Sequence, residues 1–154
     1  MFFRSIFILF AFLSSPVFAY QVGDTLPPAT QKQLHLDDQQ VAIVDFFAQW
    51  CVSCRAELPE VNTLAEQLKN RGVHFVGIDI DDDLAVGIAF QKSLGLTFAV
   101  INDTKQILVN DFQPIGMPAI YYIYQGKILK IRYGAIDNIR DVILNDLKTL
   151  GQNK

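Results

Sequence analysis

The two cysteines of this chain stand three positions apart, at Cys51 and Cys54, and the sequence holds no other thiol. Such a pair could form a structural disulfide, exchange a disulfide with another protein, or supply half of a metal site. A disulfide between residues this close closes a very small loop, so it removes little conformational entropy from the unfolded chain. Thiol–disulfide exchange is therefore a better reason for the pair than structural stabilisation.

The residues around the pair predict a buried strand that leads into a helix. Residues 42–47 are apolar except for Asp45, which is typical of a strand covered on both faces. Cys51 would lie at the helix N-terminus, where free N–H groups and the helix dipole favour a thiolate. We expect Cys51 to attack a disulfide and Cys54, almost one turn further on, to resolve the mixed disulfide. The apolar stripe of the predicted helix consists of Leu58, Val61, Leu64, Ala65 and Leu68.

Asp45 is a carboxylate inside an otherwise apolar strand. Burying it is costly unless it is paired or neutralised, and desolvation raises its pKa. We expect Asp45 to be the general base that takes the proton of Cys54 during resolution. The alternative is an aspartate paired with a nearby lysine or capped by backbone donors. Its place six residues before Cys51, on the strand that feeds the site, favours the catalytic interpretation.

Other interpretations of the polar residues are weaker. A structural metal site needs four ligands, and the two histidines, His35 and His74, do not stand at ligand-like spacing. The acidic run after the second predicted strand lacks the glycine and the distant glutamate of an EF-hand loop. A solvated loop explains the run better, although the alternation of Asp79 and Asp81 about Ile80 could place acid near the active-site edge. We expect no bound metal and no cofactor.

Length and composition indicate one exported domain. The chain has 154 residues and a formal charge of −3 without a basic run, so nucleic-acid binding has no electrostatic support. Residues 1–19 combine Arg4, an apolar run and small residues near the end, which predicts a signal peptide cleaved after Ala19. The apolar run is short for a spanning helix and contains Pro16, which disfavours an uncleaved anchor. Residues 20–154 would then form the mature domain.

Strands that alternate with helices predict a layered α/β sheet. Residues 20–40 are polar and interrupted by glycine and proline, and we expect a loop-rich extension with a short edge strand near 33–36. Residues 104–110 are ambiguous between helix and strand. The other predicted elements are strands over 73–80 and 97–101, a helix over 84–94, a hairpin of 119–124 with 128–133, and a last helix from near Asp137.

Several separate motifs resemble thioredoxin, and they stand in the family order from about Val41 to the C-terminus. The resemblance implies a thioredoxin fold, with a central mixed sheet flanked by helices. It also implies that Pro118 is a cis-proline beside the cysteine pair, although X–Pro bonds in general favour trans. In that family the backbone of the residue before this proline, here Met117, pairs with bound substrate, and Trp50 adds apolar surface. The motifs are Asp45–Cys54 with Pro59, Gly116-Met117-Pro118-Ala119, Tyr124-Gln125-Gly126-Lys127 and Gly134-Ala135.

The signal peptide, the N-terminal extension and a helix–strand insert between the cysteines and Pro118 resemble the exported TlpA/ResA-like thioredoxins. That resemblance implies a periplasmic reductase of protein disulfides. Its partners would include apocytochrome c and a membrane thiol donor of the DsbD/CcdA type. The chain departs from the subgroup at Val52-Ser53, where proline is usual, and at Asp45, where asparagine is frequent. The lysine that neighbours this aspartate in thioredoxins is replaced, with Gly77 near that place.

Three activities therefore remain open at this point. A reductase is favoured, because Val52-Ser53 adds neither histidine nor charge to stabilise a thiolate strongly. An oxidase or isomerase would use the same residues. A metal-binding chaperone without enzymatic activity is the alternative from a different class.

Overall fold

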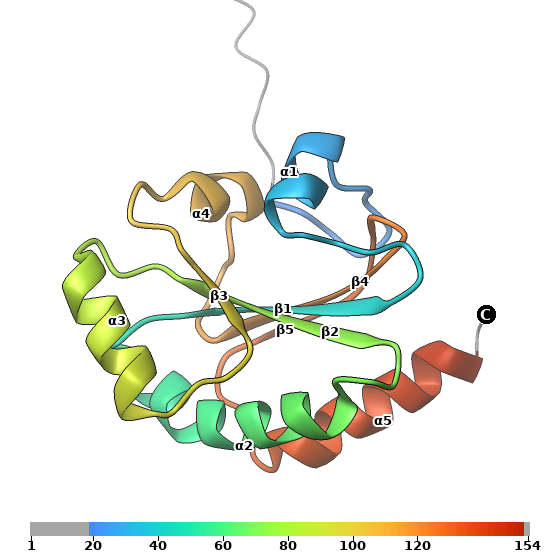
Figure 1. Cartoon of the computed structure of the whole chain (residues 1–154). Coiled ribbons are helices and arrows are strands. Elements are labelled where there is room, and N and C mark those ends of the chain that lie inside the picture. Colours follow the sequence, from blue (N-terminus) through green and yellow to red (C-terminus); the bar gives the residue numbers. More distant parts are fainter. Residues whose placement is uncertain (1–18, 153–154) are drawn as a thin grey trace, which may run out of the picture.

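The computed structural model describes residues 19–152, which form a five-stranded sheet in the order β3-β2-β1-β4-β5 (Figure 1). The central strand β1 (Val41–Phe47) pairs in parallel with β2 (Val73–Asp79), which pairs in parallel with β3 (Ala99–Asn102). On its other side β1 pairs antiparallel with β4 (Ala119–Tyr124), and β4 pairs antiparallel with β5 (Lys127–Tyr133). This mixed sheet confirms the predicted thioredoxin fold.

Helices cover both faces of the sheet (Figure 1). The longest helices, α2 (Val52–Leu68) and α5 (Ile139–Gln152), lie together against one face, below the sheet in the figure. The short helices α1 (Pro28–Gln33) and α4 (Ile107–Phe112) lie against the opposite face. The remaining helix of the described chain, α3 (Leu84–Ser93), packs near the beginning of α2.

The central strand β1 is buried along its whole length, as its apolar composition predicts. Val44 and Phe46 pack on the α1 and α4 side, whereas Ile43 and Phe47 pack on the α2 side. Because successive side chains of a strand point to opposite faces, Asp45 lies between Ile43 and Phe47 on the α2 side. The carboxyl therefore points into the layer that holds the cysteines.

The prediction of an edge strand near residues 33–36 is wrong. Helix α1 ends at Gln33, and a turn follows it at residues 34–35, so no strand forms there. Pro28 begins the helix, because a proline lacks the N–H that a first helical residue leaves unpaired. Leu34 follows the helix and is fully buried in the core. The extension does reach the sheet, but earlier in the chain, where Thr25 forms an isolated antiparallel bridge with Lys127.

The ambiguous segment 104–110 contributes to a helix, α4, rather than to a strand. Asp103 explains where it begins, since its two carboxylate oxygens accept the N–H groups of Ile107 and Val109 at 2.8 and 2.9 Å. The predicted helix–strand insert is present as α3 and β3, between β2 and β4. The predicted strand over 97–101 begins two residues later than expected, at Ala99.

The predicted signal peptide, residues 1–19, lies outside the described residues except for Ala19. Between residues 19 and 152, no helix is both long enough and apolar enough to cross a membrane.

Candidate active site around the Cys51–Cys54 disulfide

Cys51 and Cys54 are joined by a disulfide, with their Cα atoms 5.3 Å apart. Cys51 caps the N-terminus of α2, and its Sγ accepts a hydrogen bond from the Cys54 N–H at 3.2 Å. The Ser53 hydroxyl lies 3.6 Å from the same sulfur. Cys51 is 6% exposed and Cys54 is 1% exposed, so a partner from solvent reaches Cys51 first. The sulfur that is more accessible is also the one at the helix N-terminus, where a thiolate is favoured.

The disulfide lies in an apolar cluster. Phe47 at the end of β1, Leu58 of α2 and Phe90 of α3 form the buried part of this cluster with the two cysteines. Met117, from the loop before β4, packs against it. The Met117–Pro118 peptide bond is cis, as the resemblance to thioredoxin implies. Two segments about 65 positions apart in the sequence thus meet at the disulfide.

Large apolar side chains are exposed next to this cluster. Trp50 and Val52 flank Cys51 in the chain and are 61% and 83% exposed. Ile115, two residues before Met117, is 79% exposed. Exposed apolar side chains that gather beside a reactive group mark a place where another molecule binds. Sequence reasoning named Trp50 as apolar surface but did not consider Ile115, which lies in the loop before β4.

Asp45 is almost completely buried, and its Oδ1 has no hydrogen-bond partner in the described part of the chain. Burial raises the pKa of this carboxyl well above its usual value, and the negative charge of Glu57 raises it further. The residue beside it on β2 is Gly77, as the sequence indicated, so no lysine compensates the charge from that strand. A Cβ at Gly77 would come within 2.7 Å of the Phe47 ring and 2.8 Å of the Phe98 ring.

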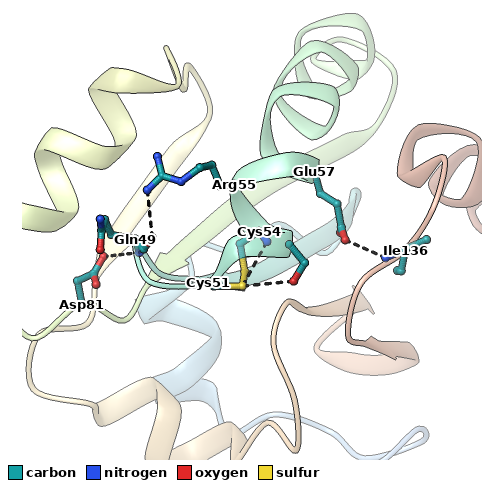
Figure 2. The surroundings of a disulfide bond; sticks show 8 residues. Gln49, Cys51, Cys54, Arg55, Glu57, Asp81 and Ile136 are labelled. Carbon is teal, nitrogen blue, oxygen red and sulfur yellow. Dashed lines mark hydrogen bonds between the residues drawn. A yellow bond between two sulfur atoms is a disulfide. The ribbon is translucent and has the colours of Figure 1, made fainter.

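Glu57 is a second buried acid, and sequence reasoning missed it. Its Oε1 accepts the Ile136 N–H at 2.8 Å, from the loop between β5 and α5 (Figure 2). Its Oε2 is buried and has no hydrogen-bond partner among residues 19–152. Burial raises the pKa of Glu57, whereas the hydrogen bond from Ile136 lowers it. The negative charges of Glu60 and Asp137 add to the increase in pKa. The available signal was spacing, because Glu57 stands three residues after Cys54 and therefore on the same side of α2.

The loop before Cys51 is held by hydrogen bonds from two other elements. The Gln49 N–H donates to Asp81 at 2.8 Å, and the Gln49 carbonyl accepts from Arg55 at 3.2 Å (Figure 2). The acidic run after β2 therefore does reach the active-site edge, which was one of the two interpretations of its sequence.

The sheet, the cis-proline loop and a disulfide at a helix N-terminus define the class of thioredoxin-fold thiol:disulfide oxidoreductases. Comparison with known proteins supports this class. Residues 22–131 match the AhpC/TSA family, and the chain belongs to this family.

Proteins with similar sequences are named for thiol–disulfide exchange. The chain is 34% identical over 142 residues to the thiol-disulfide oxidoreductase ResA of Oceanobacillus iheyensis, covering 83% of this chain and 73% of that protein. It is 30% identical over 129 residues to the thiol:disulfide interchange protein DsbE of Pseudomonas aeruginosa, covering 82% and 69%. The protein is accordingly a protein-disulfide oxidoreductase that uses the Cys51–Cys54 pair and acts on protein thiols.

Solved structures support the fold. A DsbE-type structure from Chlorobium tepidum superposes with a TM-score of 0.74 at 21% identity, covering 85% of this chain and 98% of that one. StoA from Bacillus subtilis superposes with a TM-score of 0.61 at 23% identity, covering 68% and 83%.

Proposed function

We propose that this oxidoreductase is exported to the periplasm and reduces disulfides of other proteins. The observation that favours reduction over oxidation is the set of groups that surround the disulfide. The groups around Cys51 Sγ are an N–H, a hydroxyl and apolar side chains, and two buried acids, Asp45 and Glu57, lie on the adjoining β1 and α2. A strong oxidant owes its potential to a well-stabilised reduced thiolate. Buried carboxyls disfavour a nearby thiolate, which favours the reductive direction.

The reaction begins with the reduced pair. The Cys51 thiolate attacks one sulfur of the substrate disulfide, forms a mixed disulfide and releases one substrate thiolate. Cys54, as a thiolate, then attacks Cys51 Sγ and releases the second substrate thiolate. Two electrons pass to the substrate, and the Cys51–Cys54 disulfide remains. This order follows from accessibility, because Cys54 is buried behind Cys51.

The buried position of Cys54 makes proton transfer the difficult part of resolution. Its thiol is 1% exposed, so its proton needs an acceptor inside the protein. Asp45 is the proposed acceptor, since its raised pKa brings it closer to that of a thiol and its Oδ1 has no hydrogen bond to any residue that the structure describes. Glu57 adjusts this step through its charge, which raises the pKa of Asp45.

The proposed substrate site is the apolar surface beside Cys51. Trp50 offers an exposed ring, and the backbone of Met117, next to Pro118, would pair with an extended substrate segment, as the resemblance to thioredoxin implies. The exposed side chains of Val52 and Ile115 extend this surface. A substrate with apolar residues beside its cysteine would bury them on binding.

Turnover needs a partner that reduces the Cys51–Cys54 disulfide again. The proposed donor is a membrane thiol carrier of the DsbD/CcdA type, and apocytochrome c is a proposed substrate. The resemblance to TlpA/ResA-like thioredoxins and the similarity to ResA and DsbE support both partners. The predicted signal peptide supports the location. No bound cofactor takes part in the proposed cycle.

Two measurements test this proposal. The midpoint potential of the pair should lie nearer to that of thioredoxin, about −270 mV, than to that of the oxidant DsbA, about −120 mV. In cells, the cysteines should be mostly reduced while the donor is present. A potential near the oxidant's value, with mostly oxidised cysteines, would instead establish an oxidase. Tight stoichiometric metal without disulfide turnover would establish a metal-binding chaperone.

Cysteine variants test the order of events and reveal the substrates. Cys54→Ser should trap partners on Cys51 as mixed disulfides, which gel electrophoresis without reductant separates and mass spectrometry identifies. Cys51→Ser is the matched control and should trap none and reduce no substrate. Trapping by Cys51→Ser in place of Cys54→Ser would reverse the two roles.

A further inference from the structure

Gln49, which precedes Trp50 and Cys51, is bound through both of its backbone groups. Its N–H donates to Asp81 Oδ2 at 2.8 Å, and its carbonyl accepts from Arg55 Nη2 at 3.2 Å. Figure 2 shows the two side chains meeting Gln49 from different elements, Asp81 from the loop after β2 and Arg55 from α2. A residue held on both sides leaves the following turn little freedom to shift.

Asp81 is itself fixed by a chain of hydrogen bonds that ends on α3. The Asp81 N–H donates to Asp79 Oδ1 at 3.0 Å, and Asp79 Oδ2 accepts from Gln91 at 2.7 Å. Asp79 fits here because α3 carries Gly87 at the contact, where a Cβ would stand 2.8 Å from the Asp79 carboxylate. The backbone of the residue whose carboxylate holds Gln49 is therefore fixed by a buried partner.

Arg55 is oriented by the same helix. Its guanidinium lies 4.8 Å from the centre of the Phe90 ring, and Phe90 is buried in the cluster that contains the disulfide. Both contacts to Gln49 thus depend on α3, one through Gln91 and Asp79 and the other through Phe90.

We propose that Asp81 and Arg55 are positioning residues for the redox pair, and that they act by fixing Gln49. This inference rests on the thiol–disulfide exchange activity of Cys51 and Cys54. The thiolate of Cys51 is favoured by its place at the start of α2 and by the Cys54 N–H, which is 3.2 Å from its sulfur in the disulfide form. If Gln49 moves, Cys51 leaves this place, its thiol ionises less readily, and attack slows.

Variants of Asp81 separate a positional role from an effect of charge. Asp81→Asn keeps an oxygen that accepts the Gln49 N–H but removes the charge, whereas Asp81→Ala removes both. We expect Asp81→Ala to raise the pKa of Cys51, followed by thiolate absorbance near 240 nm, and to slow insulin reduction roughly 3- to 10-fold, as the loss of one hydrogen bond would. Asp81→Asn should stay within about 2-fold of wild type, since a neutral acceptor keeps most of the contact.

Two further variants complete the test. Asp82→Ala is the matched control, because Asp82 is an exposed neighbouring carboxylate bonded to Gln106 and not to Gln49; it should behave as wild type. Arg55→Ala should act in the same direction as Asp81→Ala, and the double variant should lose less than the product of the two effects, since both hold one residue.

The Cys51 pKa and the reduction rate of these variants decide whether Asp81 and Arg55 position the redox pair. Wild-type values for the Cys51 pKa and the rate in Asp81→Ala and Arg55→Ala would overturn the positioning role. An Asp81→Asn variant as slow as Asp81→Ala would also overturn it, in favour of charge. If Asp81→Ala does not fold, as judged by its thermal transition, Arg55→Ala tests the positioning role and Asp81→Asn tests the effect of charge. A wild-type protein without turnover would contradict the exchange activity itself, which is a separate failure.

Discussion

Asp45 of β1 stands in register with Gly77 of β2, so the buried Asp45 carboxyl has no side chain beside it on that strand. The space above Gly77 is filled by the Phe47 and Phe98 rings instead. The environment of Asp45 is therefore apolar, apart from Glu57, and both influences raise its pKa.

This environment predicts that Asp45→Asn is more stable than wild type at neutral pH but less active. The pKa of Asp45 is raised in the folded state, so the wild-type protein loses stability as pH rises from the unfolded pKa, about 4, towards the folded value. Asparagine cannot ionise and avoids this loss. Denaturant midpoints of the two proteins should therefore coincide near pH 4 and separate as pH rises.

The activity of Asp45→Asn should fall, although its stability rises. Without the proton acceptor, resolution by Cys54 should slow by roughly 10²-fold, the lower end of what a general base contributes. Stopped-flow measurement of mixed-disulfide decay, from pH 5 to pH 9, checks this. An unchanged pH–rate profile would remove Asp45 from catalysis.

The contact at Gly77 predicts that this position does not accept a side chain. Gly77→Ala should destabilise the fold by about 1–3 kcal/mol, because two buried rings must shift to admit the Cβ. Gly72→Ala is not a suitable control, since its left-handed φ of +73° adds backbone strain. Gly151→Ala is suitable, because a Cβ there meets no atom of the described residues within 4 Å. Urea unfolding should show little loss for Gly151→Ala, and an equal loss at both positions would contradict the steric argument.

Asp146 of α5 ties the terminal helix to β5 and predicts a second pH dependence. Burial raises its pKa, but hydrogen bonds from Arg132 and Lys130 prevail and lower it to about 2. The unfolded value is about 3.9, so this stabilisation is present above pH 4 and is lost as pH falls towards 2. Thermal unfolding between pH 2 and pH 6 should show this loss in the wild type.

Variants of Asp146 should reproduce the loss at neutral pH. Asp146→Asn leaves Lys130 and Arg132 without their counter-charge and weakens the hydrogen bonds that they donate. Because these two side chains are 34% and 31% exposed, solvent screens part of the loss, and the cost should be about 1–3 kcal/mol. Asp141→Asn, on the exposed first turn of the same helix, should cost only a few tenths of a kcal/mol. Equal effects of the two variants would show that the buried contact contributes no more than an exposed charge.

Local patterns in the sequence were sufficient to predict the position of each site residue that depends on a single strand or helix. The apolar run of β1 placed Asp45, and the change to helical spacing placed Cys51 at the start of α2. The N-terminal helix α1 was missed because it is six residues long and shows no full apolar period. Glu57 was missed as a site residue for another reason: its role depends on Ile136, which comes close only through the tertiary fold. The alternation of the acidic run pointed to Asp81 near the active-site edge, but its hydrogen bond from the Gln49 N–H also depends on the tertiary fold.

The electrostatic effect of Glu57 on Asp45 gives a last prediction. The charge of Glu57 raises the pKa of Asp45, and Glu57→Gln removes that charge while its amide oxygen can still accept the Ile136 N–H. The pKa of Asp45 should therefore fall, and the acidic limb of the pH–rate profile for resolution should move to lower pH.

The matched control for Glu57→Gln is Glu60→Gln. Glu60 is exposed on the same helix, and its charge acts on Glu57 rather than directly on Asp45. Exposed charges are screened, so this variant should leave the profile almost in place. A shift of equal size in both variants would indicate a general effect of net charge. A shift confined to Glu57→Gln, and absent when Asp45 is already asparagine, would establish that the two acids titrate as one unit.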